Sequence, residues 1–465
     1  MPKPTTHNPT ANRRWLRILL VLLLLGAGAD FFVRGPLRIV HGTEWNDFLS
    51  PYIQSRAWIS GMDPYSTETF LKFWPAGKPV FTFVTRDVAD GTLVFKRGVP
   101  SPYPLTSFVV IAPLALMPWS VSQYVWIGLN LLATILVLCG LLAVSEVSWR
   151  DPRAWAFAAF ALAVAPLHTG LFTENPIVLV LGMGVAALWA AKFCRASLAA
   201  LAVAVAICLK PQVGLCFLLF FVVQRRWKVV TVASASCAIL MLVAIARLTA
   251  AGTPWLPSYM AASRLVFARG AINDFTAANP IWFHMLNLQA VFYPLLGSDC
   301  ATNVCALFVG VGLGVIWLFR AAGRNPGSDP FLTLSTLAVI SLLPVYHRSY
   351  DAALLVIPIA WCILRASPRT ASVRISLALS LLFLIPGGVL ITQFAERTHL
   401  SASMGNIWWW RSFVVGHQAW ALLFLAVTLL SAMLKPLEPE QQETNQNEMS
   451  ESVHVLSTQP EPLFS

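Results

Sequence analysis

Residues 11–32 read ANRRWLRILLVLLLLGAGADFF, a basic flank followed by an apolar run of about the length that crosses a bilayer. A signal peptide begins in the same way, but no small-x-small cleavage site is followed here by a soluble domain. Arg13, Arg14 and Arg17 favour a cytoplasmic start, because basic residues accumulate on that side of membrane helices. The stretch therefore predicts an uncleaved first helix over about residues 18–33.

The rest of the chain continues this apolar character. Of its 465 residues, 57% are hydrophobic and 11% are charged, whereas a soluble domain carries roughly 25% charged residues. In a bilayer, only helices and closed barrels satisfy every backbone hydrogen bond. The apolar stretches lack the alternation of barrel strands. The sequence therefore predicts an all-α, polytopic bundle of about 10–13 membrane helices, counting short ones.

The apolar segments divide into full spans and shorter elements. The full spans are expected at about residues 18–33, 120–144, 153–170, 176–191, 229–248, 303–319, 329–345, 352–364, 372–392 and 418–434. Residues 105–117 predict an interfacial or re-entrant helix, and residues 196–223 a hairpin of two half-helices entered from the cytoplasm. In this arrangement every compact Arg/Lys loop is cytoplasmic, and residues 34–103 form the first extracytoplasmic loop.

The domain organisation follows from these spans. Residues 1–17 form a cytoplasmic N-terminus, and residues 18–435 a multi-pass domain in the inner (plasma) membrane. Residues 436–465 are rich in Pro, Glu, Gln and Ser and predict a disordered, acidic cytoplasmic tail. The net charge of +11 is explained by topology-marking Lys and Arg residues, so we expect no nucleic-acid partner.

Several kinds of chemistry lack their motifs in this chain. There is no P-loop, dinucleotide fingerprint, GxSxG or HExxH motif, and no zinc-ligand spacing. We therefore expect no metal and no cofactor, and a reaction driven by a substrate presented in the membrane or outside it. Of the eight cysteines, Cys300 and Cys305 lie close together in a predicted loop, where both a disulfide and free thiols remain open.

Asp47 follows the first helix, beside Phe48, in the segment EWNDFLSPYIQSRAWISGMDPY, residues 44–65. A solvated loop carboxylate is the simplest interpretation of such a residue. The segment, however, has aromatic rings to pack, and Pro64 stiffens its GMDPY turn. An ordered carboxylate at the membrane surface is suited to act as a general base.

Lys210 lies between two apolar half-helices and is followed by Pro211, which breaks the helix. A lysine at that depth costs roughly 2.5–3.5 kcal/mol on insertion scales, and such charges are functional by default. An ammonium there would suit a phosphate. The alternative is a structural lysine paired with a carboxylate.

Two polar turns are predicted on the extracytoplasmic side. YHRSYD, residues 346–351, contains His347, Arg348 and Asp351. It is either a site for a phosphate or pyrophosphate head group or a loop in which Asp351 caps the next helix. HTGLFTEN, residues 168–175, supplies Glu174 as a second candidate acid, although a turn carboxylate is more often solvated.

Aromatic residues mark two further outer loops. Trp408 belongs to NIWWWR in the last of them, a pattern typical of an interfacial aromatic belt, although aromatic rings also stack on sugars. The loop 249–302 holds four residues that would suit an acceptor groove, namely Trp282, His284, Asn287 and Gln289.

Several motifs, in this order along the chain, resemble glycosyltransferase family 87, whose members are integral-membrane enzymes of the GT-C type. They are the Asp-Phe pair with GMDPY, then PYPLTSFVVIAPLALMP, TGLFTENPIVLVL, LKPQVGLCFLLFFVVQRRWK and HRSYDAALLVIPI. The resemblance covers about residues 15–435. The chain departs from it where the family's Tyr-Pro-Pro is Tyr103-Pro104-Leu105 and its Gly-Gln is Thr173-Glu174.

The resemblance implies an inverting transfer of a hexose, typically mannose, from a polyprenyl-phosphate donor to a hydroxyl of a lipid-linked or envelope glycan outside the membrane. It implies that Asp47 is the general base. Lys210, with Arg348 and His347, would hold the donor phosphate, so no metal is demanded. Further substrate contacts are expected from Tyr65, Tyr103, Glu174, Asn175, Gln212, Tyr350, Asp351 and Trp408.

Two other functions share parts of this pattern. A transporter or flippase of a lipid-linked sugar would also have many helices and a buried lysine, but it needs neither a base nor a long ordered first loop. An inactive assembly subunit of an envelope-polysaccharide complex is a third interpretation, which the presence of both Asp47 and Lys210 disfavours.

Overall fold

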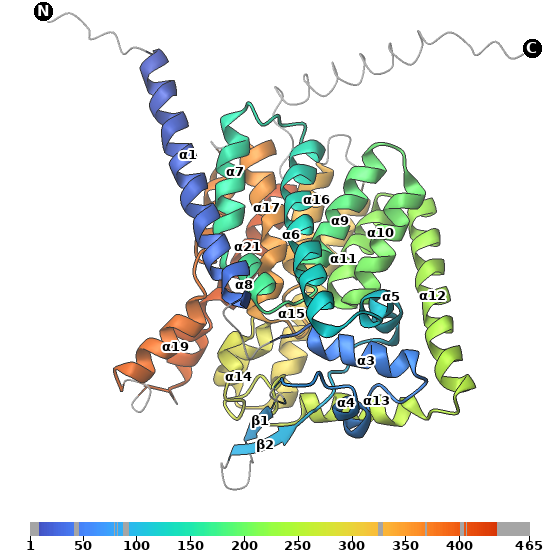
Figure 1. Ribbon diagram of the computed structural model, residues 1–465. Coiled ribbons are helices and arrows are strands. Elements are labelled where there is room, and N and C mark those ends of the chain that lie inside the picture. Colours follow the sequence, from blue (N-terminus) through green and yellow to red (C-terminus); the bar gives the residue numbers. More distant parts are fainter. Residues whose placement is uncertain are drawn as a thin grey trace, which may run out of the picture.

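The chain folds into a helical bundle, with α1 (Pro9–Arg34) lying along one side (Figure 1). The computed structural model describes residues 9–40, 46–78, 80, 82–86, 93–323, 329–367, 370–399, 404–405 and 407–434. The predicted all-α, polytopic class is confirmed. The tail 436–465, predicted to be disordered, lies outside the described residues.

Five described helical stretches are long and apolar enough to cross a membrane. They are residues 15–39 of α1 and α2 (Pro36–Val40), α6 (Trp119–Val144), α12 (Trp227–Ala250), α15 (Asp299–Ala322) and α21 (His417–Leu434). A sixth span is formed if α7 (Pro152–Ala163) and α8 (Ala165–Phe172), bent by 52°, count as one. The bend lies just before Pro166, whose ring cannot continue the helical hydrogen bonds.

The remaining predicted spans are shorter or broken. α9 (Ile177–Lys192) and α16 (Pro330–Ile340) are apolar but short, and residues 352–364 divide among η2 (Ser349–Leu355), α17 (Val356–Ala360) and η3 (Trp361–Arg365). Every residue of α16 after Pro330 is buried, so protein rather than lipid surrounds most of it. The predicted span 372–392 is wrong. α18 (Ala371–Leu381) ends before the Pro-Gly-Gly at 386–388, and α19 (Gly387–Arg397) points away from the bundle (Figure 1).

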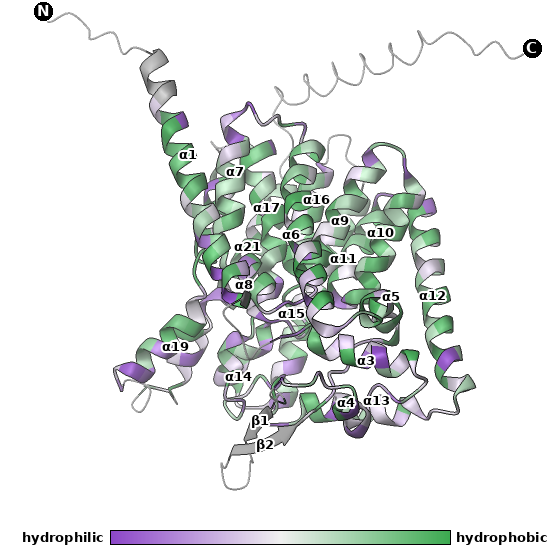
Figure 2. Ribbon diagram, viewed as in Figure 1, coloured by the Kyte–Doolittle hydropathy of each residue, from purple (hydrophilic) through white to green (hydrophobic). Residues whose placement is uncertain are grey.

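The two long connecting segments gather at one end of the bundle, called here the cavity end, which is the lower end in Figure 1; in Figure 2 this end mixes hydrophilic and hydrophobic residues, whereas the helices above it are mainly hydrophobic. The first loop contributes α3 (Leu49–Ile59), α4 (Thr67–Lys72) and the antiparallel strands β1 (Thr82–Arg86) and β2 (Leu93–Arg97), and the short helix α5 (Leu105–Ala115) follows it. The later loop contributes α13 (Trp255–Phe267), η1 (Trp282–His284) and α14 (Leu288–Leu296). α5 is short, as predicted. α15 begins at Asp299, so Cys300 and Cys305 lie in its first turns, as exposed free thiols.

The first loop is packed onto the bundle. Trp58 of α3 donates its indole N–H to the Ala244 carbonyl of α12 at 3.0 Å. In the GMDPY turn Gly61 has φ +71°, a conformation that suits glycine, and the Asp63 carboxylate accepts the Tyr65 N–H at 2.9 Å. These contacts give the segment that carries Asp47 a fixed position against the membrane helices.

Candidate active site

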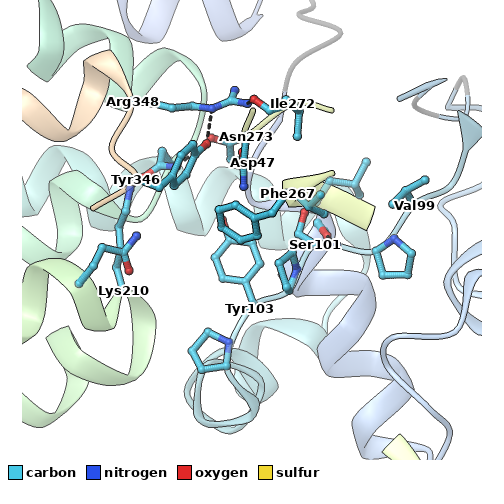
Figure 3. Close-up of a pocket in the computed structure, with 18 of the residues that line it drawn as sticks. Asp47, Val99, Ser101, Tyr103, Lys210, Phe267, Ile272, Asn273, Tyr346 and Arg348 are labelled. Atoms are coloured by element: carbon cyan, nitrogen blue, oxygen red, sulfur yellow. Dashed lines mark hydrogen bonds between the residues drawn. The ribbon is translucent and has the colours of Figure 1, made fainter. Parts of the chain in front are cut away.

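A cavity of about 1050 Å³ opens at this end of the bundle. Asp47, Lys210 and Arg348 all line it, although they are far apart in the sequence. In Figure 3, Lys210, Tyr346 and Arg348 lie on one side of the cavity, and Val99 and Ser101 lie on the other. Ligand pockets typically measure roughly 300–1000 Å³, so the space is large enough for a sugar with its phosphate.

Asp47 is held from two directions. Its backbone N–H donates to the Thr173 carbonyl at 2.8 Å, and its Oδ2 accepts a hydrogen bond from Asn175 Nδ2 at 2.8 Å. The neighbouring Phe48 is fully buried and stacks on Trp126, with ring centroids 4.3 Å apart. The carboxylate is therefore positioned at the cavity by the turn between α8 and α9.

Lys210 lies at the break between α10 (Ala196–Leu209) and α11 (Pro211–Val223). Its backbone is extended, with φ −151° and ψ 84°, and Pro211 starts the second helix. Gly214 lies so close to α10 that an added Cβ would be 2.4 Å from the Ile207 backbone nitrogen. The two half-helices are therefore packed together at their junction, which places the lysine side chain at the cavity.

The Lys210 ammonium is already partnered. It donates to Asn175 Oδ1 at 3.0 Å, forms an ion pair with Asp351, and lies 4.6 Å from the centre of the Tyr350 ring. Lys210 is 7% exposed and Asp351 is 1% exposed. The carboxylate partner left open by the sequence is thus Asp351. An ammonium has three N–H groups, so one remains for another acceptor.

Asp351 and His347 lie behind this wall. His347 Nδ1 is 3.0 Å from Asp351 Oδ2, which also accepts the Arg348 backbone N–H at 3.3 Å. Asp351 therefore helps to cap η2, but as the third residue of that helix in a capping box, whereas the N-cap position that the sequence suggested for it belongs to Arg348. Burial raises the pKa of Asp351, but Lys210 and His347 outweigh it and lower that pKa to about 2. His347 is fully buried and does not line the cavity. The structure therefore gives it no direct position for the predicted phosphate contact.

These contacts form one polar chain, which runs Asp47, Asn175, Lys210, Asp351, His347. It joins the first loop, the α8–α9 turn, the α10–α11 break and η2. Hydrogen bonds to charged groups are stronger than neutral ones. A substitution at one member is therefore expected to shift the side chains of its neighbours in the chain.

Arg348 faces the cavity in a different way. Its Nε donates to the Tyr346 hydroxyl at 2.5 Å and its Nη2 to the Ile272 carbonyl at 3.1 Å (Figure 3). Within the described part of the chain, no carboxylate lies within ion-pair distance of it. It is a guanidinium, held at a fixed place, whose charge is available to an anion.

Glu174 is buried beside Asp47 and does not line the cavity. It has φ +55°, an unusual conformation for a residue other than glycine. Its Oε1 accepts from Gln123 at 2.5 Å, and its Oε2 has no partner among the described residues. Burial raises the pKa of this carboxyl to about 7. The structure therefore gives Glu174 no direct position at the cavity for the expected substrate contact.

The other predicted contacts divide into two groups. Tyr103, Asn175, Gln212 and Tyr350 line the cavity. Tyr65 does not, but its hydroxyl donates to the Tyr103 carbonyl at 2.6 Å. Trp408 is 54% exposed and away from the cavity. Of the four residues expected to form an acceptor groove, Gln289 lines the cavity and Trp282, His284 and Asn287 do not.

Much of the lining was not predicted. The main additions are Trp74 and Lys78 from the first loop, Tyr259 and Phe267 of α13, and Ile272, Asn273 and Tyr346. Apart from Tyr346, which begins the YHRSYD turn, these residues belong to none of the motifs described above. The Pro- and aromatic-rich composition of the two long loops is the signal that pointed toward them.

The cavity does not resemble a metal site. Within the described ranges, no group of three His, Cys, Asp or Glu side chains is placed to hold a metal ion. Its charged groups are instead one carboxylate, Asp47, and three cations, Lys78, Lys210 and Arg348.

Comparison with known families gives one match. The model of glycosyltransferase family 87 matches residues 102–345, which is 244 of 465 residues and more than half of the chain. Lys210 and Asn175 lie inside the matched range, while Asp47 and Arg348 lie outside it. No curated protein and no solved structure matches the chain.

Proposed function

The chain belongs to glycosyltransferase family 87 and is a membrane glycosyltransferase, and from this premise we propose the reaction that its cavity performs. The protein transfers a hexose from a polyprenyl-phosphate donor to a hydroxyl of a lipid-linked or envelope glycan, and mannose is the hexose that we propose. The anomeric configuration is inverted. The cavity end faces the extracytoplasmic side of the inner membrane.

One observation carries this proposal. A single cavity holds the Asp47 carboxylate, fixed by Asn175, and the Arg348 guanidinium, which has no ion-pair partner in the described part of the chain. A group that accepts a proton and a group that binds an anion therefore share one space. Glycosyl transfer from a phosphate requires both.

The reaction is a single displacement. Asp47 takes the proton of the acceptor hydroxyl as that oxygen bonds to the anomeric carbon. The bond between the anomeric carbon and the phosphate oxygen breaks, and its electron pair leaves on the phosphate. Polyprenyl phosphate is an adequate leaving group without protonation, so one carboxylate suffices, whereas glycoside hydrolases use two.

Cationic side chains stabilise the charge that develops on the phosphate. Arg348 supplies a planar fork of donors, and Lys210 supplies the N–H that Asn175 and Asp351 leave free. His347 acts on the phosphate only through Asp351 and Lys210, because it lies behind them. We propose no metal in this step, since these side chains provide the positive charge.

Membranes that contain the protein, incubated with radiolabelled polyprenyl-phosphate mannose, test the proposal. A glycosyltransferase makes a new labelled glycan, and the Asp47→Asn variant does not. A flippase would only move label between leaflets, and an inactive assembly subunit would leave the donor unchanged. Either of those results would reject the proposed reaction.

A further inference from the structure

A second hollow, of about 470 Å³, lies against α3 and the turn after α4. Its lining includes Tyr52, Arg56, Lys72, Trp74 and Trp119. It is distinct from the main cavity but shares one lining residue with it, Trp74. Its chemistry combines aromatic rings with positive charge.

The positive charge in this hollow is not neutralised by the described chain. Arg56 and Lys72 are exposed, and no described carboxylate lies within ion-pair distance of either. Arg56 donates to the Tyr52 hydroxyl at 3.1 Å, and both side chains line the hollow. Two neighbouring cations without a counter-ion create a local positive potential that attracts an anionic ligand.

The aromatic surface is rigid. Trp119 meets Tyr52 edge to face, with ring centroids 5.0 Å apart, and meets Phe48 at 5.7 Å. The indole N–H of Trp119 is buried and has no partner among the described residues. The π face of an aromatic ring is electronegative and packs against the C–H groups of a sugar ring, so this surface suits a carbohydrate.

The hollow also adjoins the Asp47 side of the cavity. Phe48, the neighbour of Asp47, packs on Trp119, and Lys78, which lines the main cavity, lies 5.0 Å from the centre of the Trp119 ring. In an in-line displacement the acceptor approaches on the side of the base, away from the leaving phosphate. A ligand seated in the hollow would therefore approach Asp47 past Trp74 and Lys78.

We propose that this hollow is an acceptor subsite for an anionic glycan, one that carries a phosphate or a carboxylate. The rings hold a sugar of the acceptor, Arg56 and Lys72 hold its negative group, and the hydroxyl to be glycosylated reaches Asp47. That the bound glycan is the acceptor rests on the proposed function, whereas the binding of an anionic glycan can be measured without any transfer.

The test is a binding measurement on the full chain in phosphatidylcholine nanodiscs. The probes are a mannose disaccharide bearing a phosphate monoester and the same disaccharide without it. The wild type should bind the phosphorylated probe at least about tenfold more tightly, because two charge-assisted contacts each contribute on the order of a tenfold factor. The double variant Arg56→Gln/Lys72→Gln should lose this preference, and Arg264→Gln, an exposed cation of α13 outside both hollows, should keep it.

The preference should also fall as salt is raised, and Arg56→Lys should retain most of it, which separates charge from folding. Equal binding of the two probes by the wild type would overturn the inference. An unchanged preference in the double variant would also overturn it. If phosphatidylglycerol vesicles compete as strongly as the phosphorylated sugar, the hollow binds lipid head groups and the inference is again overturned. If binding behaves as expected but no transfer occurs, the subsite stands and the proposed function fails.

Discussion

Asp47 and Lys210 are joined by a single side chain: Asn175 donates to the Asp47 carboxylate at 2.8 Å and accepts from the Lys210 ammonium at 3.0 Å. The amide therefore orients the proposed base and a proposed phosphate ligand at the same time. Its own orientation is fixed further by the Ile177 N–H, which donates to Asn175 Oδ1 at 3.0 Å. The proton-accepting and anion-binding parts of the cavity are thus connected by the hydrogen bonds of one amide.

Replacing Asn175 with Ala should lower kcat by about 10- to 100-fold, because hydrogen bonds to charged groups are each worth roughly 1.5–3 kcal/mol. Steady-state transfer from radiolabelled donor measures the effect. Gln418→Ala removes a buried amide that bonds the Leu382 and Ile385 carbonyls, away from the cavity, and should leave kcat within a few-fold. Equal losses in the two variants would show that the Asn175 effect is a general one on folding.

The buried pair of Lys210 and Asp351 makes a prediction about stability as well as binding. Lys210→Met alone leaves a buried carboxylate without its cation, which should cost about 3–5 kcal/mol. In Lys210→Met/Asp351→Asn the remaining charge is also removed, so thermal stability should largely recover. Donor affinity should stay low in both variants if Lys210 also binds the phosphate.

Unfolding temperature and donor binding, measured together on these two variants, separate the two roles. Recovery of donor binding along with stability in the double variant would assign Lys210 a purely structural role. The single variant Asp351→Asn completes a double-mutant cycle with these two variants and the wild type, which gives the interaction free energy of the pair.

Glu174 predicts a pH dependence. Burial raises its pKa from 4.5 to about 7, so the folded state binds this proton more tightly than the unfolded state does. The resulting stability is present in full below about pH 4.5 and is lost as the pH rises through 7, a change of about 3 kcal/mol. Glu174→Gln keeps the Gln123 contact and cannot ionise. The wild type should therefore lose thermal stability relative to Glu174→Gln between pH 5 and pH 8, and parallel curves would contradict the account.

The proposed orientation is open to labelling in intact cells. In a background where the exposed Cys139, Cys194, Cys300 and Cys305 are replaced by Ser, Ser66→Cys should react with a membrane-impermeant maleimide. Arg150→Cys, in the connection between α6 and α7, at the end of the bundle opposite the cavity (Figure 1), should react only after the cells are opened. The reverse pattern would place Asp47 on the cytoplasmic side and reject an outward-facing cavity.

The fold class was predictable from the sequence, and the sequence also drew attention to Asp47 and Lys210, both of which line the cavity. Apolar runs identify a helical membrane protein because the bilayer leaves the backbone few options, and Lys210 is conspicuous because a charge between apolar half-helices is costly. Helix lengths were less predictable. α16 is short, yet all of it after Pro330 is buried, because neighbouring helices surround it. The expected span 372–392 is interrupted at the Pro-Gly-Gly at 386–388, where the backbone itself disfavours a continuous helix.

The partners of the site residues were not predictable. Asp351 lies 141 residues beyond Lys210, and a capping role explained it equally well from local sequence. Glu174 is a turn carboxylate by its sequence context and a buried one in the structure. Arg56 and Lys72 look like ordinary loop charges until α3 and α4 bring them to the same hollow.

The central claim is that Asp47 is the general base, and single-turnover transfer by Asp47→Asn with saturating donor tests it most directly. The substitution keeps the size of the side chain and removes its basicity, and loss of a general base typically lowers the rate by about 10²–10⁴-fold. We predict a loss of this size with donor binding unchanged. Near-normal turnover in Asp47→Asn, together with loss of activity in Glu174→Gln, would contradict the account and move the base to the turn between α8 and α9.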